Sequence, residues 1–410
     1  MKRIMINDIC EVYDGPHATP TKTEKGPVYL GIDAITEDGM LDETRFSHLS
    51  EDDYYKWTKR IIPQKNDIVF SYEATLGRYA MIPEDFYGCL GRRLAIIRNV
   101  SDRINTKWLY YYFKSPEWTG FIKNQTVKGS TVDRISIEDF PQYTVPLIPI
   151  HNQNKIVDVL DKIDCKIVNN RKINDYLDEM AKTIYDYWFV QFDFPDENGN
   201  PYKSSGGKMS FIDDFGLAPS DWKSGNLYDI AEFINGLACQ KYRPDETEDS
   251  LPVIKIKEMH EGISSNTERV KATIPQNNIV NTGDILFSWS ASLEVQRWAG
   301  FKGALNQHIF KVIPKANYTQ SYVYHQLKAY IIKFVQMAEA RKTTMGHITN
   351  DHLKQSVIVL PPDNIIRKFS NQIDSIHTEI SRINKENQKL YQLRNWLLPM
   401  LMNGQATIEN

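Results

Sequence analysis

The chain has 410 residues, of which 41% are hydrophobic and 25% charged, and its formal net charge at pH 7 is −3. Such values are those of an ordinary globular protein, so they exclude a disordered chain, a collagen-like chain and a small disulfide-rich domain. The near-neutral charge also excludes a strongly basic, histone-like DNA binder, although it allows local basic faces. At roughly 150 residues per domain, the length predicts two or three domains.

Cysteine usage and hydropathy predict a cytoplasmic protein. The cysteines lie at least 70 residues apart, which excludes a CxxC motif and favours reduced, mostly buried thiols. The first residues contain no apolar stretch typical of a secretory signal. No run of 18 apolar residues occurs, so no membrane-spanning helix is expected. The four cysteines are Cys10, Cys89, Cys165 and Cys239.

The first 150 residues are expected to form a mixed domain of strands and helices. Runs of β-branched and aromatic residues, broken by Gly, Pro and Asn, predict strands at 67–72, 93–100 and 143–148. Helical periodicity predicts a helix over 108–121. Residues 1–150 therefore read as one globular domain.

A long helix is predicted next, over 151–192. Neither Gly nor Pro occurs between His151 and Phe194, and apolar or amide side chains recur at alternating steps of four and three. This spacing is typical of a coiled-coil seam. A polar run from Pro195 to Pro201 ends the helix, and 193–220 is expected to act as a linker. The seam consists of Ile156, Leu160, Ile163, Ile167, Asn170, Asn174, Leu177, Ala181 and Ile184.

The second half of the chain repeats the first in the same order. The clearest match joins the segment from Asp8 to Gly15 with that from Asp229 to Gly236. Four further short matches follow, and all five offsets fall between 212 and 225. They pair 27–28 with 252–253, 67–72 with 284–289, 135–136 with 348–349 and 145–149 with 357–361. We infer a unit of roughly 210 residues that is present twice. A second domain is expected over 221–362, with a helix at 318–337.

A second long helix, over 363–404, precedes a short tail at 405–410. Its seam superposes on the first at an offset of 213, which places Asn387 on Asn174, and a buried polar pair would fix the register of two paired helices. The expected fold is α+β: two tandem mixed α/β domains, each followed by a long helix, with the helices paired as an antiparallel coiled coil about a pseudo-twofold axis. The alternative is that each helix packs on its own domain. The second seam consists of Phe369, Ile373, Ile376, Ile380, Ile383, Asn387, Leu390, Arg394, Leu397 and Leu401.

No familiar catalytic motif is present. Gly207-Lys208 is followed by methionine and lacks the upstream glycine of a phosphate-binding loop, and no GxGxxG occurs. The amino-methyltransferase motif Asn-Pro-Pro-aromatic is absent, and no histidine pair has the spacing of a metal site. We therefore predict no catalytic residue, no metal and no cofactor on this chain.

Basic charge is concentrated in one part of each expected domain. Residues 59–134 contain 13 Lys and Arg against 7 Asp and Glu, and 241–347 contain 14 against 10. Such patches suit DNA phosphates, while Arg, Gln and Asn also read base edges. An ordinary mixed surface remains the alternative explanation. The candidate DNA contacts are Arg78, Arg92, Arg93, Lys123, Gln125, Lys128, Ser130, Thr131, Lys241, Arg243, Arg297, Arg341, Lys342, Thr343 and Thr344. Arg78 and Arg297 are expected on matching loops.

Taken together, these features resemble the specificity (S) subunit of type I restriction–modification systems. The resemblance rests on the tandem duplication and on the two segments that begin the domains, Asp8 to Gly15 and Asp229 to Gly236. It also rests on the passages at 145–157 and 357–369 and on the ending at 397–404. It covers essentially the whole chain. One departure is that the family often has Glu-Gln at the start of each helix, where this chain has Asn152-Gln153 and Pro362-Asp363-Asn364.

The resemblance implies two target recognition domains, each reading one half of a bipartite site in double-stranded DNA, with the coiled coil as a ruler between them. It also implies partners: two modification subunits that carry S-adenosylmethionine, and restriction subunits that use ATP and magnesium. The S subunit itself is non-catalytic. Two other hypotheses stay open on the sequence, namely a coiled-coil adaptor that never touches DNA, and a nuclease or methyltransferase with an unfamiliar site.

Overall fold

The computed structural model describes residues 2–36, 38–129, 132–213, 215–245, 247–264, 266–290, 293–340, 348, 350–406 and 408. The chain divides into two compact units. The first unit is Met1–Lys166 together with Leu390–Asn410, and the second unit is Ile167–Lys389.

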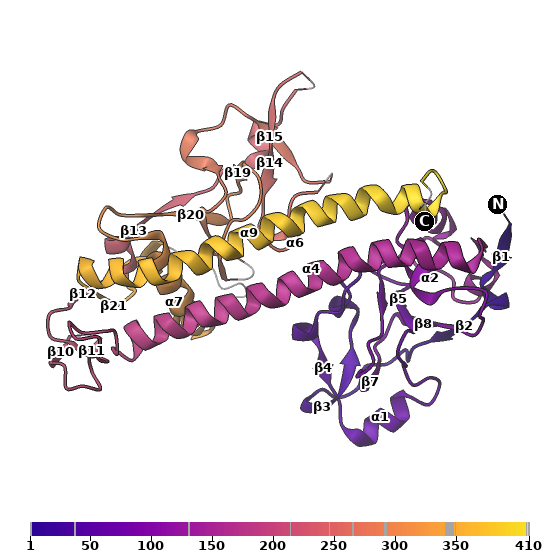
Figure 1. Cartoon of the computed structure of the whole chain (residues 1–410), viewed down its shortest axis with the longest axis horizontal. Coiled ribbons are helices and arrows are strands. Elements are labelled where there is room, and N and C mark those ends of the chain that lie inside the picture. Colours follow the sequence, from indigo (N-terminus) through magenta and orange to yellow (C-terminus); the bar gives the residue numbers. More distant parts are fainter. Residues whose placement is uncertain are drawn as a thin grey trace. The chain divides into compact units, whose positions relative to one another are not determined.

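The first unit is built on a four-stranded antiparallel sheet covered by helices. The order across the sheet is β2 (Cys10–Asp14), β8 (Leu94–Asn99), β5 (Ile68–Ser71) and β6 (Tyr79–Met81). The helix α2 (Thr106–Phe113) lies between this sheet and the start of α4 (Ile150–Tyr185), as Figure 1 shows. Six consecutive side chains of α2, from Trp108 to Phe113, are buried, because the helix is covered on both sides.

The helix expected over 108–121 is in fact two helices, α2 and α3 (Pro116–Gln125). The break has a local cause. Ser115 caps the second helix by accepting a hydrogen bond from the backbone N–H of Trp118 at 3.3 Å, and Pro116 occupies the first helical position. The strands expected at 67–72, 93–100 and 143–148 are confirmed as β5, β8 and β9 (Thr144–Pro146).

Smaller elements complete the first unit. A three-stranded sheet has the order β4 (Ser47–His48), β3 (Thr23–Leu30) and β7 (Gly88–Leu90), and α1 (Glu51–Trp57) packs on it. Strands β3 and β7 are parallel. A separate pair joins β1 (Arg3–Met5) to β9.

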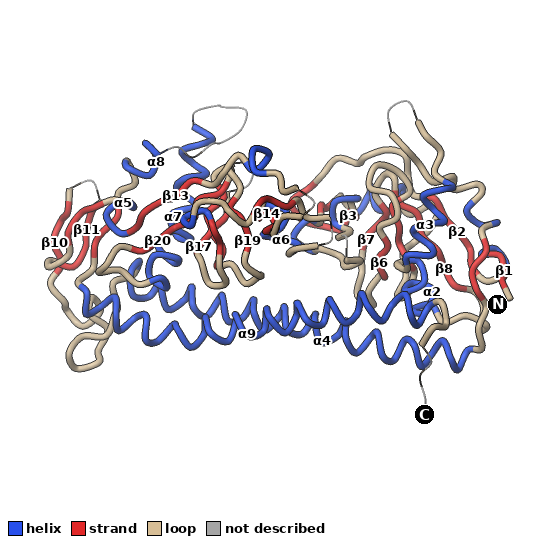
Figure 2. The backbone as a smooth tube through the Cα atoms, turned by 90° about the horizontal axis from the view of Figure 1, so that it is seen from above, coloured by secondary structure: helices blue, strands red, loops and turns tan. Residues whose placement is uncertain are grey.

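The second unit has the same strand order in its main sheet and adds one strand, β16, to its smaller sheet, which confirms the internal duplication. Its main sheet runs β13 (Ala231–Asn235), β20 (Ile309–Pro314), β17 (Ile285–Ser288) and β18 (Glu294–Arg297). Its smaller sheet runs β15 (Arg269–Lys271), β14 (Ser250–Ile254), β19 (Gly303–Leu305) and β16 (Ile279–Val280), with β14 and β19 parallel. The pair β12 (Lys223–Gly225) and β21 (Ile358–Leu360) corresponds to β1 and β9. Figure 2 shows the main sheet beside α7 (Gln320–Ala340), which takes the place of α2 and α3.

Strand pairing corrects one of the sequence matches. Tyr29 pairs with Cys89 in the first unit, and Val253 pairs with Ala304 in the second. Val253 is therefore the equivalent of Tyr29, at an offset of 224, and not of Val28 at 225. One residue matters in a strand because it exchanges the two faces.

The expected linker, 193–220, is itself folded. It contains the hairpin of β10 (Met209–Ile212) and β11 (Gly216–Pro219). Phe194 and Ala218 are buried in the core of the second unit, and Phe194 stacks on the ring of Trp222 at 5.4 Å. This segment therefore belongs to the second unit and does not behave as a bare connection.

The long helices α4 and α9 (Asp363–Met402) pack antiparallel within each unit. In the second unit, Asn170 bonds to Asn387 at 2.8 Å and Asn174 to Asn384 at 2.7 Å. Asn174 and Asn387, which superpose through the repeat, thus each face a different asparagine of the partner helix and not each other. The buried seam residues are Ile156, Leu160, Ile163, Ile167, Asn170, Ala181, Phe369, Ile373, Ile376, Ile383, Asn387, Arg394 and Leu401, while Leu177, Ile380 and Leu390 are half-buried.

The alternative reading of the seams, packing on the domains, also holds in part. Ile373 and Ile376 join the core of the second unit together with α7. In the first unit, Ile156 and Leu160 of α4 share one core with Leu398 and Leu401 of α9. Each helix thus packs both on its partner helix and on a sheet domain.

Candidate nucleic-acid interface

Four backbone hydrogen bonds, which we call the loop frame, hold the loops at one end of the strands of the main sheet in the first unit. Glycine is required twice, because a Cβ on Gly15 would lie 2.6 Å from the carbonyl oxygen of Leu94, and a Cβ on Gly91 would lie 2.3 Å from that of Leu30. The N–H groups donate as follows: Gly15 to Leu94 at 2.9 Å, Gly91 to Leu30 at 2.8 Å, Tyr72 to Arg93 at 3.2 Å and Ile135 to Tyr72 at 2.8 Å.

The second unit repeats this frame bond for bond. Gly236 takes the place of Gly15, and a Cβ there would lie 2.0 Å from the carbonyl oxygen of Asn306. This close approach of a backbone carbonyl explains why each of the two matching segments, Asp8 to Gly15 and Asp229 to Gly236, ends in glycine. The N–H groups donate as follows: Gly236 to Ile309 at 3.1 Å, Asn306 to Ile254 at 3.2 Å, Trp289 to His308 at 3.3 Å and Ile348 to Trp289 at 3.1 Å.

The frame presents a short turn that connects β7 to β8 in the first unit. Arg92 is exposed, and no ion pair of its guanidinium is seen among the residues that the structure describes. Arg93 has a left-handed backbone, with φ of 73°, and its Nε lies 2.9 Å from a carboxylate oxygen of Glu73. Arg92 thus offers an uncompensated charge, while the charge of Arg93 is largely neutralised.

Further basic side chains surround this turn. His17 Nε2 lies 2.9 Å and Arg60 Nη1 3.8 Å from the carboxylate of Asp14, at the end of β2. Arg134 is exposed on a loop that pairs with Val127 and bridges to Glu73. We call His17, Arg60, Arg92, Arg93, Lys128 and Arg134 the first-unit loop cluster. Sequence reasoning missed His17, Arg60 and Arg134, because they come from separate loops that only the sheet brings together.

Other candidates from the sequence lie near this cluster. Lys123 and Gln125 are exposed at the end of α3, and Lys128 is exposed on the loop that follows. Lys123 also lines a cavity of about 220 Å³ between α3 and the loop after β5. Ser130 and Thr131 lie outside the described residues.

Arg78 and Arg297 do not occupy matching positions, which corrects the sequence-based expectation. Arg297 pairs with Ile285, and the first unit has Met81 opposite the corresponding Ile68. Arg78 donates to the carbonyl oxygen of Ile35 at 3.0 Å. Arg297 faces α7, and burial lowers the pKa of its guanidinium. Both side chains are engaged inside their own units, so we leave them out of the candidate interface.

The second unit presents a different set of side chains on the same frame. Lys241 and Arg243 are exposed on the segment after Gly236, as His17 is after Gly15. In the turn from β19 to β20, Gln307 and His308 stand where the first unit has Arg92 and Arg93. His308 was not among the candidates from the sequence, where it is an isolated histidine. Arg341, Lys342, Thr343 and Thr344 lie outside the described residues.

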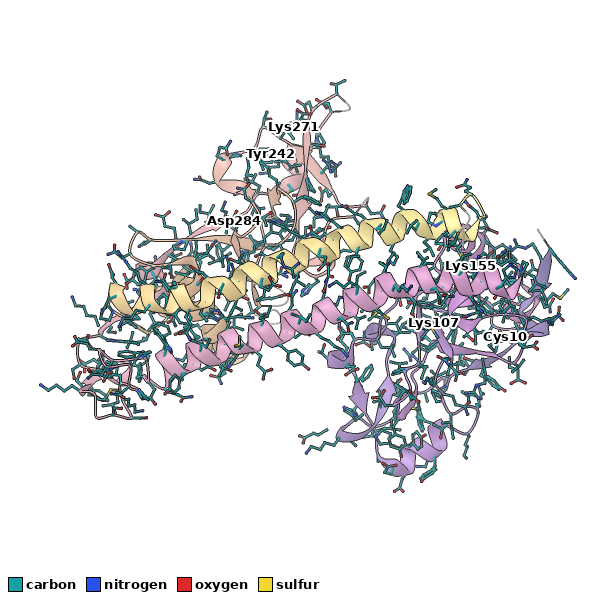
Figure 3. The ribbon with its side chains drawn as sticks, viewed as in Figure 1. Cys10, Lys107, Lys155, Tyr242, Lys271 and Asp284 are labelled. Carbon is teal, nitrogen blue, oxygen red and sulfur yellow. The ribbon has the colours of Figure 1, made fainter. Side chains whose placement is uncertain are left out.

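Within the described part of the chain, no group of three or more His, Cys, Asp or Glu side chains is arranged to hold a metal ion. Nor is any helix there long and apolar enough to cross a membrane. Of the cysteines, Cys10, Cys89 and Cys239 are buried and Cys165 is exposed, and none forms a disulfide. Figure 3 shows Cys10 in the first unit, where burial raises the pKa of its thiol to about 12.

Comparison with known proteins gives a consistent family. The family model for the type I restriction modification DNA specificity domain matches residues 1–179 and again 219–391. The MjaIX specificity subunit of Methanocaldococcus jannaschii is 23% identical, over 85% of this chain and 79% of that protein. The HindI specificity subunit of Haemophilus influenzae is 22% identical, over 83% and 87%. The crystal structure of an S subunit from M. genitalium aligns with a TM-score of 0.49 at 15% identity, over 98% and 95% of the two chains.

Proposed function

Because this chain belongs to the family of type I restriction modification DNA specificity domains, we propose that it is the DNA-sequence-reading subunit of a type I restriction–modification complex. The chain does not catalyse a reaction itself. One observation carries the proposal beyond the family match: two units share one loop frame but present different side chains on it. A subunit that reads two unlike half-sites needs that combination.

The proposed division follows the repeat. Residues 1–150 and 221–362 are the two target recognition domains, 151–192 and 363–404 are the helices, and 193–220 connects the repeats. Each domain reads one half of a bipartite site. The helices act as the ruler that sets the unread spacer between the halves.

In the first domain, the first-unit loop cluster is the proposed DNA surface. Its exposed cations suit phosphate oxygens, and Arg92 also suits the guanine edge in the major groove. Lys123 and Gln125 extend this surface, and Lys241 and Arg243 serve the second domain. Contacts to phosphate position the protein, while contacts to base edges give the specificity.

An apolar stripe on α4 supports the binding of protein partners. Ile173, Tyr176 and Met180 of α4 are 45%, 71% and 47% exposed, and Tyr187, in the π-helical turn that follows α4, is 38% exposed. The steps of three, four and seven keep them on one helix face. Such a run on a surface helix indicates a protein interface. At an offset of 213, Leu393 of α9 corresponds to Met180 and is also exposed, whereas Glu386 and Lys389 stand where the stripe has Ile173 and Tyr176.

We propose that these two repeat-related surfaces each bind one modification subunit. Two helix faces at repeat-related positions, which share an exposed apolar residue at Met180 and Leu393, suit a partner that is present twice. The modification subunits would carry S-adenosylmethionine, and restriction subunits would carry ATP and magnesium, so no cofactor is needed on this chain.

The test is co-expression with the cognate modification subunit, followed by mapping of methylated adenines across the host genome. We expect a split motif with a fixed gap, which disappears when this chain is deleted. As a matched pair, Arg92→Glu should weaken methylation of all sites, whereas Lys354→Glu, on an exposed residue of α8 (Asn350–Lys354), should not. Unchanged methylation after deletion would contradict the proposal and favour an adaptor that does not touch DNA.

A further inference from the structure

Arg92 and Gln307 occupy the same place in the two units. Each is the middle residue of a three-residue turn, 91–93 and 306–308, between the strands that flank it. Parallel pairing fixes the start of each turn, because Leu90 faces Leu30 and Leu305 faces Ile254. Antiparallel pairing fixes the end.

That second pairing places Leu94 opposite Ser71 and Ile309 opposite Ser288. The turns are therefore held at both ends by equivalent strands, and the frame described above adds equivalent bonds within them. Position 92 of the first unit and position 307 of the second unit thus present side chains from the same point of the same scaffold.

The chemistry presented from that point differs between the units. Arg92 carries a charge and lies among the cations of the first-unit loop cluster. Gln307 is neutral, so it gives no counter-charge to a phosphate. The side chain of Gln307 is also held in place, because its Nε2 lies 3.2 Å from Nε2 of His308.

His308 is itself positioned by two contacts. Its backbone N–H donates to Oδ1 of Asn306 at 3.3 Å, and its ring centre lies 5.6 Å from that of Trp289. When the imidazole accepts one N–H of the Gln307 amide, the second N–H and the carbonyl oxygen remain on one edge of that amide. A donor beside an acceptor in this geometry matches N7 and the N6 amino group of adenine.

We propose that residues 92 and 307 are the repeat-related specificity residues of the two half-sites, with Gln307 reading an adenine and Arg92 a guanine, each in the major groove. His308 is a positioning residue that orients the amide. This inference rests on the proposed function, since it presupposes that each unit reads DNA. It adds which side chain reads a base in each half-site, and which base.

The experiment uses the complex reconstituted with its modification subunits and DNA in which one half-site at a time is randomised. For the wild type we expect an adenine preference at one position of one half-site, which Gln307→Ala reduces roughly 5- to 150-fold. Gln307→Arg should move that preference to guanine. Arg92→Gln should move a guanine preference to adenine in the other half-site only.

Salt dependence separates base reading from phosphate binding. Gln307→Ala should leave the slope of log K against log salt unchanged, whereas loss of a phosphate contact lowers it by about one. The matched control is Gln355→Ala, at an exposed glutamine after α8 in the same unit. Thermal unfolding of each variant confirms that it is folded, and the isosteric Gln307→Glu gives a second substitution that also loses the adenine preference.

The outcomes distinguish the two levels of the proposal. A wild-type complex without any sequence preference would contradict the proposed function. A wild-type complex that reads a split site, but whose preferences are the same in folded Gln307→Ala and Gln307→Glu, would overturn the inference and leave the proposed function intact.

Discussion

His325 and His377 face each other in the second unit, with their Nε2 atoms 3.1 Å apart and their rings stacked at 5.1 Å. In the first unit the equivalent positions hold Tyr111 and Asp164, whose hydroxyl and carboxylate are 2.8 Å apart. The contact between a domain helix and a long helix is thus made by different side chains in the two repeats.

A neighbouring pair shows the same substitution of chemistry. Lys107 and Asp161 form an ion pair at 2.6 Å in the first unit, where Figure 3 shows Lys107 beside α4. The second unit has Ser321 donating to Asp374 at 2.5 Å. An ion pair and a hydroxyl–carboxylate pair therefore stabilise the first junction, whereas the second contains a histidine pair and a hydroxyl–carboxylate pair, which gives the two units different responses to pH.

The first prediction concerns acid. Burial, reinforced by the nearby cations Lys328 and Arg297, lowers the pKa of His325 to about 3, and burial with Arg297 lowers that of His377 to about 2. Both residues are neutral in the folded unit but titrate near 6.5 when unfolded. The stability that they contribute is complete above pH 6.5 and falls as the pH drops below it. By pH 5 the loss should be about 2 kcal/mol for each histidine.

Thermal unfolding between pH 7.5 and 5 measures this effect. The control is the double variant His325→Tyr with His377→Asp, which installs the pair of the first unit. The unfolding temperature of this variant should depend less on pH than that of the wild type. Equal pH dependence of the two proteins would refute the role of the histidine pair.

A second prediction concerns the buried amide pair of the long helices. Asn170 and Asn387 are both buried and bonded to each other. Asn387→Leu removes one of the two acceptors of the Asn170 amide, which also donates to Glu386 at 3.0 Å, and should lower the free energy of unfolding by about 1–3 kcal/mol. The double change to leucine should restore much of this stability, because it leaves no unsatisfied amide and the two apolar side chains pack against each other. Denaturant unfolding of the four proteins in this cycle gives the coupling energy, and simple additivity would show that the pair is not coupled.

A third prediction tests the loop frame. In Gly15→Ala and Gly236→Ala the new Cβ meets a backbone carbonyl, and we expect a loss of roughly 1–3 kcal/mol in the unfolding free energy. Gly120→Ala is the matched control, because that glycine lies in α3 with nothing within 4 Å of its Cβ position. This control should stabilise the protein by about 0.5–1 kcal/mol. If all three substitutions behave alike, the close approach at the frame has no energetic consequence.

A fourth prediction addresses the apolar stripe. Tyr176→Glu combined with Met180→Glu should weaken binding of the modification subunit roughly tenfold or more, because charged side chains lose the apolar contact. Tyr55→Glu, at a tyrosine that is 70% exposed on α1, controls for general surface changes. Titration calorimetry with the purified modification subunit provides the measurement. Unchanged affinity in the double variant would exclude the stripe as the docking surface.

A fifth prediction tests the ruler. Insertion of one heptad at facing positions of α4 and α9 keeps the seam in phase and lengthens each helix by about 10 Å. At ~3.4 Å per base pair, the unread spacer should grow by about three base pairs. Methylation mapping reports the gap directly, with a heptad of the same composition inserted in the loop after Pro195 as control. A gap that stays the same in both proteins would disprove the ruler.

Periodicity predicted the elements of this fold, but pairings across the fold needed the structure. The steps of four and three located α4 and α9 because a long helix has one buried stripe whatever covers it. The same pattern superposes Asn174 on Asn387 through the repeat. It does not tell which residues are in contact, because along an antiparallel pair the residue numbers rise in one helix as they fall in the other. The sequence also treated 193–220 as a linker, since its polar residues concealed the aromatic side chains that pack into the second unit.

The candidate site was predictable only in outline. Charge counts located the basic segments, and Arg92 is exposed as expected. Whether an arginine faces solvent or a neighbouring helix depends on strand register, which is why Arg78 and Arg297 were placed wrongly on matching loops. His308 was missed because its importance comes only from its place in the second unit, where it is the equivalent of Arg93.

The last turn of α9 supplies Leu398, Leu401 and Met402 to the core of the first unit. During synthesis, the N-terminal domain therefore emerges without part of its interior and waits for more than two hundred further residues before that core is complete. An exchange of residues 1–150 between relatives must also match this final turn. The N-terminal domain and the end of the C-terminal helix thus fold as one module, although they lie at opposite ends of the sequence.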